Sequence, residues 1–360
     1  MDGKTVKAST RTESKADAIQ ACKDFYNGLL LKKAQNLPLT QSQSFVRVAN
    51  ELIKEDQRRV DSHEVKSKRL VTDQQYILKA DLLPFFGSTN LKDINYQNIS
   101  DYVDYLKSRG KKVVGSNTIK RHFVLISKIL KHAHKLGMIQ SLPIFPTIKT
   151  QDNPREWFSP KEYETLRKCA AKCAKQKMVV RGVPVTDEMR YLITMMVNCM
   201  FRTPDLPTLK NQDISIEKIH LLITLKSKVD TQQVVSMPAA LGIYKDLTEF
   251  NKAKGFGKPN DYVFFPALTR DYAMATMRRQ FDAIAEKCGL KFSPEGKPRT
   301  LYSLRHTSIS LRMLNAEHPD AYLLSLNART SVDMIQRYYG SKLTPQMNVE
   351  KLQSMKSKRN

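Results

Sequence analysis

The pattern of apolar and polar residues divides the chain into a run of helices, a short β-rich stretch and a second run of helices. Within 42–56, five apolar residues share one helical face at the i, i+3, i+4, i+7, i+8 spacing: Phe45, Val48, Ala49, Leu52 and Ile53. A helical pattern covers ten further segments: 14–34, 76–83, 99–106, 116–136, 159–170, 191–200, 271–288, 301–314, 320–326 and 332–339. Pro84 predicts the end of one of these helices, because proline interrupts the backbone hydrogen bonds of a helix.

Two β-rich runs, 214–225 and 232–237, predict a small antiparallel hairpin sheet. The segment 142–160 carries four prolines and no periodic pattern, which is typical of a linker between two folded units. The fold class that we expect is therefore mainly α, with a small antiparallel β-sheet in the second of two domains.

The domain boundaries follow from these breaks. We assign 1–60 to an N-terminal accessory segment and 61–142 to an all-helical domain. Residues 143–157 form the predicted linker, 158–350 the larger α+β domain, and 351–360 a basic tail.

The charge balance indicates a polyanionic partner. Sixty Lys and Arg residues against 35 Asp and Glu leave a formal net charge of +25. Nucleic acid is the leading interpretation, since each phosphate neutralised by a cation releases condensed counterions. A ribosome-associated protein, a membrane-surface protein and general basicity without a partner are the alternatives. No apolar run reaches the roughly 18 residues that span a bilayer, so we expect no membrane.

One predicted helix, 116–136, carries a basic face. Lys120, Arg121, Lys128 and Lys131 lie on it, beside an apolar face that would pack in a core. Such a face is usually only solvated, but it also fits a surface that follows a phosphate backbone. These four residues are our candidates for DNA binding.

The first segment with reactive residues is Met-Phe-Arg-Thr-Pro-Asp-Leu at 200–206, directly after a strongly apolar helix. Arg202 closes this apolar run and needs a partner, because an unpaired charge near a core is costly. An ion pair with Asp205 would satisfy it. Alternatively, Asp205 holds Arg202 in place while its guanidinium binds a phosphate. The residues leave both interpretations open.

Three further segments concentrate polar groups. Lys226 and Lys228 lie in the predicted hairpin turn, where lysines are ordinarily only solvated. The segment 301–308 gathers Tyr302, Arg305 and His306 at one helical end. The segment 330–340 holds Thr330, Tyr338 and Tyr339, and tyrosines of this kind are most often residues at the edge of a core.

In this order, the four segments resemble the tyrosine recombinase (phage integrase) family. That family presents an arginine, a lysine, a His-x-x-Arg pair, a His or Trp, and then a nucleophilic tyrosine. The resemblance implies that Arg202 is the first arginine, supported by Asp205. It also implies that Lys228 is the catalytic lysine, with Lys226 as second choice because hairpin length varies.

The same resemblance assigns Arg305 as the second arginine and Tyr339 as the nucleophile, with Tyr338 as the alternative. Two positions depart from the family pattern. Tyr302 replaces the histidine of His-x-x-Arg, and a phenol is a poor base at neutral pH. Thr330 stands at the later His or Trp position and offers one hydroxyl. His306 is expected to be a buried neighbour of Arg305.

The family resemblance also implies an architecture and partners. Residues 61–142 resemble a helical core-binding (SAM-like) domain, 158–350 a catalytic domain, and 1–56 an arm-binding entry segment. The expected reaction on double-stranded attachment-type sites passes through a 3′-phosphotyrosyl intermediate, without ATP, metal or cofactor. A homotetramer would form at synapsis, with DNA-bending or directionality proteins as possible accessories. Five scattered cysteines fit a reducing cytoplasm, and we expect a nucleoid location in a bacterial or phage-infected cell.

Two other functions stay in competition with a recombinase that integrates or excises a mobile element. A type IB topoisomerase-like enzyme would share the chemistry without exchanging strands. A non-catalytic DNA-binding protein, such as a regulator or decayed integrase, is compatible with the departures at Tyr302 and Thr330. Trapping of a covalent DNA adduct separates the last of these from both enzymes.

Overall fold

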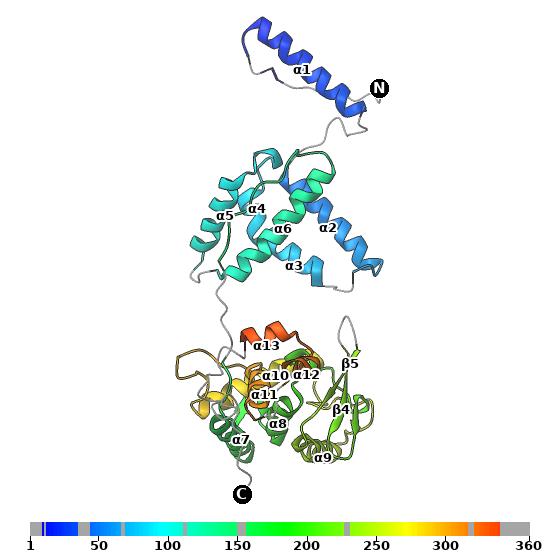
Figure 1. The fold of residues 1–360 in the computed structure, drawn as a ribbon, viewed down its shortest axis with the longest axis vertical. Coiled ribbons are helices and arrows are strands. Elements are labelled where there is room, and N and C mark those ends of the chain that lie inside the picture. Colours follow the sequence, from blue (N-terminus) through cyan, green and yellow to red (C-terminus); the bar gives the residue numbers. More distant parts are fainter. Residues whose placement is uncertain are drawn as a thin grey trace, which may run out of the picture. The chain divides into compact units, whose positions relative to one another are not determined.

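The computed structural model describes residues 9–10, 12–34, 44–65, 69–110, 114–149, 156–226, 231–315 and 320–338. The chain separates into two compact units, Met1–Gln151 and Asp152–Asn360 (Figure 1). Both are mainly helical, and small antiparallel sheets occur in the second. The predicted fold class is confirmed.

The first unit is built from helices. In chain order they are α1 (Lys15–Ala34), α2 (Phe45–Asp61), α3 (Arg69–Ile77), a π-helical turn (Leu78–Leu82), α4 (Leu83–Phe86), a 3₁₀ turn (Leu91–Asp93), α5 (Tyr96–Ser108) and α6 (Ser116–Lys135). The apolar face predicted around Phe45 is buried in the core of this unit, together with faces of α5 and α6. Helix α2, which the sequence places largely in the accessory segment 1–60, thus packs within the helical unit, because its apolar face needs a partner.

The predicted helix end at Pro84 is wrong, because the helical path continues to Phe86. The π-helical turn precedes Pro84, which lies in the first turn of α4, where a missing N–H is tolerated. Pro84 cannot donate to the carbonyl of Ala80, and the Nη1 of Arg109 donates to that oxygen at 2.7 Å. The side chain of Arg109, at the end of α5, thus hydrogen-bonds the backbone carbonyl that Pro84 leaves without a donor.

The second unit combines helices with two small sheets. Its elements are α7 (Pro160–Lys175), β1 (Val179–Val180), β2 (Val183–Pro184), α8 (Asp187–Cys199), β3 (Ile214–Ile216), β4 (Leu221–Lys226), β5 (Thr231–Val235), α9 (Ala239–Lys252), α10 (Arg270–Lys287), α11 (Ser303–Asn315), α12 (Ala321–Ala328) and α13 (Val332–Tyr338). Two 3₁₀ turns, Thr203–Asp205 and Asn211–Asp213, lie between α8 and β3.

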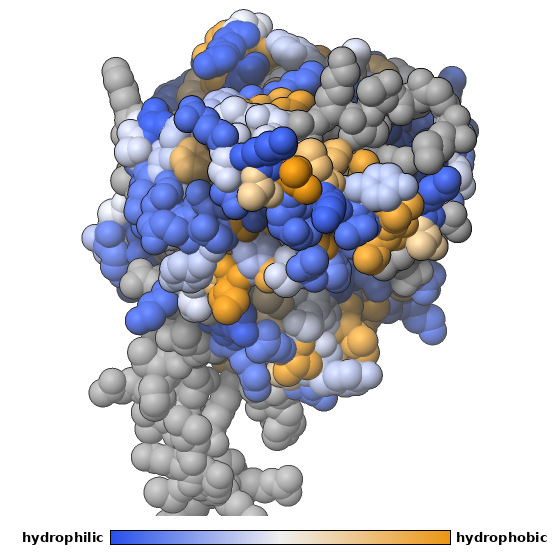
Figure 2. Space-filling view, turned by 90° about the horizontal axis from the view of Figure 1, so that it is seen from above, coloured by the Kyte–Doolittle hydropathy of each residue, from blue (hydrophilic) through white to orange (hydrophobic). Residues whose placement is uncertain are grey.

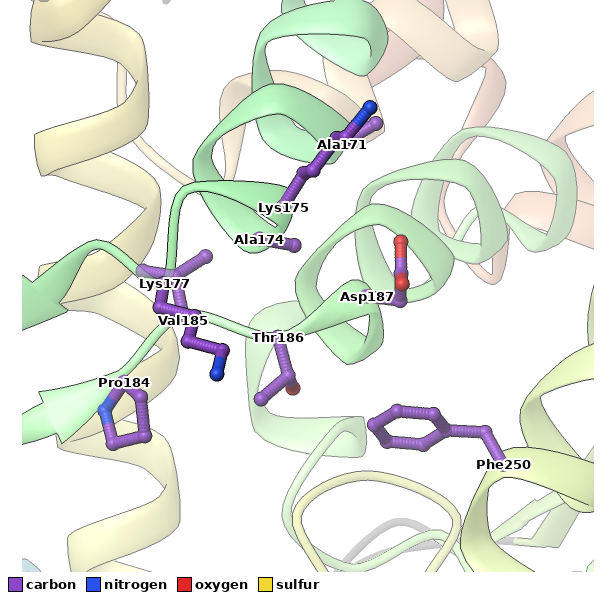
Figure 3. A pocket seen from close by; sticks show the side chains of 9 residues that line it. All are labelled: Ala171, Ala174, Lys175, Lys177, Pro184, Val185, Thr186, Asp187 and Phe250. Atoms are coloured by element: carbon purple, nitrogen blue, oxygen red, sulfur yellow. The ribbon is translucent and has the colours of Figure 1, made fainter.

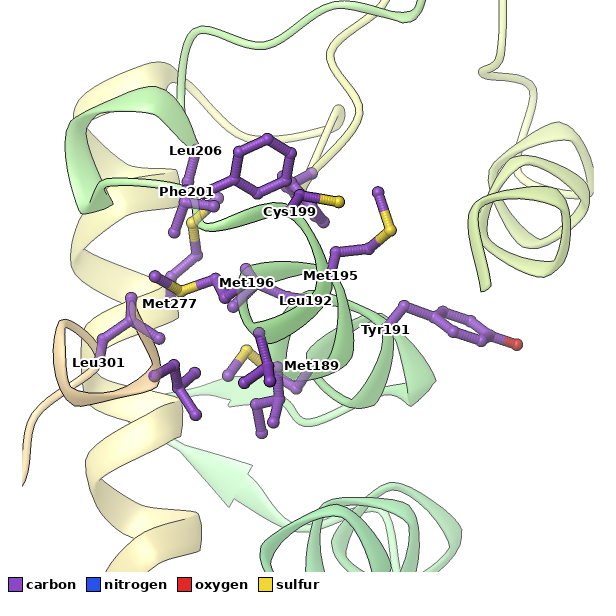
Figure 4. Packing of buried hydrophobic residues seen from close by; sticks show 14 of the residues in the cluster. Met189, Tyr191, Leu192, Met195, Met196, Cys199, Phe201, Leu206, Met277 and Leu301 are labelled. Carbon is purple, nitrogen blue, oxygen red and sulfur yellow. The ribbon is translucent and has the colours of Figure 1, made fainter. Parts of the chain in front are cut away.

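Helix α8 forms the centre of this unit. Its residues are apolar on nearly every face, and all but three of its thirteen are buried. The side chains of Met189, Leu192 and Met196 pack toward Met277 of α10 and Leu301 (Figure 4). A helix that is apolar all round has to be enclosed by its neighbours. The residues that follow α8 therefore start from the enclosed core of this unit.

The sheet has more strands than the sequence predicts. The run 214–225 is divided into β3 and β4, which pair antiparallel, and β5 completes the order β3-β4-β5. The sequence also did not predict α9 or the β1–β2 hairpin. Helix α9 does carry a helical signal, since Ala240, Tyr244 and Leu247 are buried at the i, i+4, i+7 spacing.

Candidate active site

The first arginine segment begins where α8 ends. Met200 adopts a left-handed conformation with φ 53°, and Arg202 then leads into the 3₁₀ turn that ends at Asp205. The Arg202 backbone N–H donates to Oδ2 of Asp205 at 2.7 Å, and the Asp205 N–H donates to the Arg202 carbonyl at 2.9 Å. Asp205 thus fixes the backbone of Arg202.

The ion pair of Asp205 is formed with Arg329, a residue that the sequence analysis missed. The Arg329 guanidinium contacts both carboxylate oxygens, with Nη1 at 3.3 Å from Oδ1 and Nη2 bound to Oδ2. Its side chain is only 2% exposed. A buried bidentate pair of this kind holds its two segments in one geometry. The sequence does contain a signal for Arg329 as a site residue, because it follows an apolar helix just as Arg202 does.

Arg305 joins the same two segments through their backbones. It lies in α11 and is 2% exposed. Its Nη1 donates to the carbonyl of Met200 at the end of α8, and its Nη2 donates to the carbonyl of Ala328 at the end of α12. A guanidinium is well suited to this position, since helix C-termini carry unpaired carbonyls and partial negative charge.

A second arginine of α11, Arg312, was also missed by the sequence analysis. Its Nη1 donates to the carbonyl of Val197 at 2.9 Å and its Nη2 to that of Asn198 at 2.6 Å. Burial lowers the pKa of Arg312 to about 10, so the group stays charged at neutral pH. The end of α8 is therefore held by two arginines, Arg305 and Arg312.

Thr330 and α13 are attached to this assembly. The Thr330 N–H donates to the carbonyl of Ser325 at 2.9 Å, and the Ser331 Oγ accepts from the N–H of Met334 at 3.2 Å. Helix α13 is anchored by one fully buried side chain, Ile335, in a small cluster with Met200, Ile309 and Ala328. The structure thus brings the Arg202, Arg305 and Thr330 segments together.

Tyr302 and His306 lie one helical turn apart in this region. Their rings meet edge to face with centroids 5.2 Å apart. His306 is buried and Tyr302 half-buried. Tyr302, at the position that departs from the family pattern, is thus packed against His306.

A pocket of about 280 Å³ lies between the lysine-bearing hairpin and the 3₁₀ turn that follows Arg202. Lys226 ends β4, pairs with Asp213 at 3.4 Å between Nζ and Oδ1, and lines this pocket with Asp205 and Thr224. Lys228 and Tyr339 lie outside the described residues. Tyr338 is the last residue of α13, and its side chain is also outside the description.

The candidate DNA-binding residues of α6 do not share one environment. Lys120, Arg121 and Lys131 are exposed, whereas the Nζ of Lys128 binds the buried Asp56 at 3.0 Å. On the face drawn in Figure 2, hydrophilic residues predominate and hydrophobic residues form small separate groups.

A larger pocket, of about 640 Å³, is lined by none of the candidate site residues. It lies between α7, β2, α8 and α9, with the ring of Phe250 on one side and Lys175 and Lys177 on another (Figure 3). In the described part of the chain, no group of three or more His, Cys, Asp or Glu side chains is arranged to hold a metal ion. Within the same residues, no helix combines the length and the apolar character needed to cross a membrane.

Two family models match consecutive parts of the chain. Residues 156–343 match the model of the phage integrase family, and 44–149 match the phage integrase SAM-like domain. No curated protein sequence matches the chain.

The solved structures that share this fold include three DNA-bound recombinases. A lambda integrase dimer bound to a COC′ core site has a TM-score of 0.60 at 16% identity, covering 91% of this chain and 87% of that one. For the Tn1549 transposon integrase with circular intermediate DNA, the TM-score is 0.61 at 14% identity, over 85% and 98%. For the XerH recombinase bound to a palindromic difH substrate, it is 0.54 at 16% identity, over 92% and 88%.

The arginine segments, the hairpin and the two family matches define a tyrosine site-specific recombinase. The chain belongs to the phage integrase family.

Proposed function

We propose that this recombinase cleaves and rejoins double-stranded DNA through a 3′-phosphotyrosyl intermediate and thereby integrates or excises a mobile element. The observation that carries the proposal is the joining of three segments far apart in sequence. Arg305 binds the ends of α8 and α12, and Arg329 binds the turn that follows Arg202. Two candidate phosphate-binding arginines and the segment leading to the tyrosine are thereby held at one place.

The proposed chemistry assigns one role to each group. Arg202 and Arg305 stabilise the negative charge that develops on the non-bridging oxygens of the phosphate, because a guanidinium matches them in charge and geometry. Tyr339 attacks the phosphorus, with Tyr338 as the alternative. Lys228, or Lys226, protonates the leaving 5′ oxygen. Tyr302 and Thr330 can each offer a hydroxyl hydrogen bond to the phosphate.

The covalent phosphotyrosine keeps the energy of the broken phosphodiester, so rejoining requires no ATP. Buried arginines also favour this reaction, since a guanidinium stays charged when it is removed from water. We propose that no metal or other cofactor takes part.

The proposed partners follow from the relatives. The lambda integrase structures include a dimer on a core site and a tetramer on a Holliday junction, and the Tn1549 integrase is bound to transposon DNA. For this chain we propose attachment-type DNA sites, a homotetramer at synapsis, and accessory DNA-bending or directionality proteins. We place its action at the nucleoid, in the cytoplasm.

The test is a suicide-substrate assay without metal. The protein is incubated with nicked DNA from the ends of its parent element and run on a denaturing gel. We expect a DNA-shifted band that Tyr339→Phe abolishes and Tyr338→Phe retains. The reverse result would move the nucleophile to Tyr338.

Absence of any adduct on DNA that the protein demonstrably binds would favour a non-catalytic DNA-binding protein. An adduct accompanied by relaxation of supercoils without exchange between two duplexes would favour a topoisomerase-like enzyme.

A further inference from the structure

One side chain connects the lysine-bearing hairpin to the segment that leads to the tyrosine. Asn327 lies in the last turn of α12, and Val235 is the last residue of β5. The Nδ2 of Asn327 donates to the Val235 carbonyl at 2.9 Å, and the Val235 N–H donates to the Asn327 Oδ1 at 2.8 Å. The amide thus pairs with the strand backbone as a neighbouring strand would.

The hydrogen-bonding pattern of the sheet explains why Val235 accepts this partner. Strand β5 is at the edge of the sheet, and Val235 pairs in register with Leu222 of β4. The adjacent Ser236 donates its N–H inward to Leu221. Because such bonds alternate along an antiparallel pair, the N–H and C=O of Val235 point outward, where Asn327 meets them.

This contact crosses an open groove. A pocket of about 510 Å³ lies between β5 and α12, and the α12 side chains Leu323 and Leu326 beside it are 61% and 55% exposed. Close apolar packing therefore does not hold β5 against α12 here. The two hydrogen bonds of Asn327 link these two elements through polar groups.

Both linked elements are adjacent in the chain to residues that act in the proposed reaction. Helix α12 leads through Arg329 and Thr330 into α13, while β5 is the return strand of the hairpin that bears Lys226 and Lys228 (Figure 1). We propose that Asn327 is a positioning residue, which holds the hairpin so that its lysine reaches the leaving oxygen of the phosphate that the tyrosine attacks. This inference rests on the proposed function and goes beyond it.

The chemistry of the step supplies a selective test. The tyrosine oxygen forms a bond to phosphorus, the bond from phosphorus to the 5′ oxygen breaks, and that oxygen keeps the electron pair. The lysine ammonium gives it a proton, and the phenolic proton of the tyrosine passes to water. Sulfur at the 5′ bridging position removes the need for this proton, because a thiol has a pKa of about 8.5, far below that of a hydroxyl, so the thiolate leaves without being protonated.

The experiment measures single-turnover cleavage of two nicked substrates, one with a normal phosphodiester and one with a 5′-bridging phosphorothiolate. We expect Asn327→Ala and Asn327→Asp to cleave the phosphodiester about 10 to 100 times more slowly than wild type, as for a misplaced general acid. Both variants should cleave the phosphorothiolate at close to the wild-type rate. Lys228→Ala and Lys226→Ala serve as references, and we expect the variant that lacks the acid to behave in the same way.

Leu326→Ala is the matched control, because it shortens a neighbouring exposed side chain of α12 and leaves both amide bonds in place. We expect it to cleave both substrates like wild type. An Asn327 variant that slows equally on both substrates would overturn the inference, and so would one that slows on neither. If wild type itself forms no adduct on bound DNA, the proposed function fails, and the inference with it.

Discussion

The two units of this chain, the helical unit Met1–Gln151 and the catalytic unit Asp152–Asn360, bury different sets of charged side chains. In the helical unit the buried charges are the carboxylates of Asp56 and Asp81, whose cations Lys128 and Arg109 are 38% and 36% exposed. The catalytic unit buries carboxylates as well, but guanidinium groups are enclosed beside them, as with Arg299 and Arg305, each at 2% exposure. In the helical unit, partly exposed cations therefore pair with buried carboxylates. In the catalytic unit, cationic side chains are themselves buried.

This difference matters for a protein that binds phosphates. A cation that neutralises a buried carboxylate offers less charge to a DNA backbone. A buried guanidinium stays charged and acts in a medium of low polarity, where its effect on a nearby phosphate is stronger. The contrast teaches that the basic residues counted in a sequence are not equivalent, because their partners in the fold decide what charge they present.

One buried carboxyl group of each unit, Asp56 and Glu188, has a shifted pKa, and the two shifts are opposite. Burial alone would raise the pKa of Asp56, but hydrogen bonds from Gln74 and Lys128 and the charges of Lys128 and Arg59 lower it below its ordinary value. Burial raises the pKa of Glu188 to about 7, and the N–H of Phe265 and the charges of Lys254 and Arg270 only partly oppose this. A carboxylate that hydrogen-bonds a cation directly stays ionised, whereas one that hydrogen-bonds a backbone N–H, with cations farther away, is protonated more easily.

The largest effect is expected when the catalytic unit loses an enclosed cation. Arg329→Ala leaves Asp205 as an uncompensated buried charge, so we expect the free energy of unfolding to fall by about 3–5 kcal/mol. DNA cleavage should fall with it. Chemical denaturation and the suicide-substrate assay measure the two effects.

The matched change in the helical unit is Lys128→Ala, which leaves Asp56 with Gln74 and Arg59. We expect it to cost about 1 kcal/mol, because its partner is still satisfied and Lys128 is partly in water. If Arg329→Ala and Lys128→Ala lowered the free energy of unfolding by the same amount, the proposed difference between the two units would be wrong.

The second effect depends on pH. The unfolded chain ionises Glu188 near pH 4.5 and the folded chain near 7, so the stability of the catalytic unit falls as the pH rises through this interval. Glu188→Gln keeps the acceptor for Phe265 and removes the titration. We expect this variant to be more stable than wild type at pH 8 by up to about 3 kcal/mol, with little difference at pH 4, in denaturation series at several pH values.

Asp56→Asn in the helical unit is the control, because its effect on stability should depend on pH in the opposite direction. The stabilisation from Asp56 is present above its ordinary pKa and is lost as the pH falls through the lower folded pKa. This variant should therefore be less stable than wild type at neutral pH and approach it in acid. A stability difference for Glu188→Gln that does not change with pH would contradict the assignment.

A smaller effect concerns DNA binding by α6. Lys131 is exposed, whereas Lys128 binds Asp56, so we expect Lys131→Ala to reduce the salt dependence of DNA binding more than Lys128→Ala does. One lost phosphate contact lowers the slope of log K against log salt by about 0.9. Binding titrations at several salt concentrations measure it. A larger change for Lys128→Ala would show that DNA competes with Asp56 for this lysine.

The smallest effect is expected at the departure from the family pattern. Tyr302→His restores an imidazole, which can exchange a proton near neutral pH, so the cleavage rate should be equal to or up to about tenfold above that of wild type. The rate is measured on the nicked substrate. Complete loss of cleavage would show that the phenol, packed against His306, has a role of its own.

Much of the fold was predictable because it depends on local patterns. The buried face of α2, the apolar helix α8 and the β-rich stretch all follow from the spacing of apolar residues. Pro84 shows the limit of such rules, since a π-helical turn and Arg109 accommodate it. A proline predicts a break only where no other part of the chain supplies the missing partner.

The sequence by itself determined the fold class, the family and the candidate residues, because periodicity and the order of motifs are local properties. Only the tertiary structure decided which groups meet. Asp205 forms its ion pair with Arg329, 124 residues away, and meets the nearby Arg202 through the backbone N–H of that residue, while Asn327 pairs with Val235 across 92 residues. These partners depend on how α12 packs beside α8 and β5, and no spacing along the chain encodes that packing.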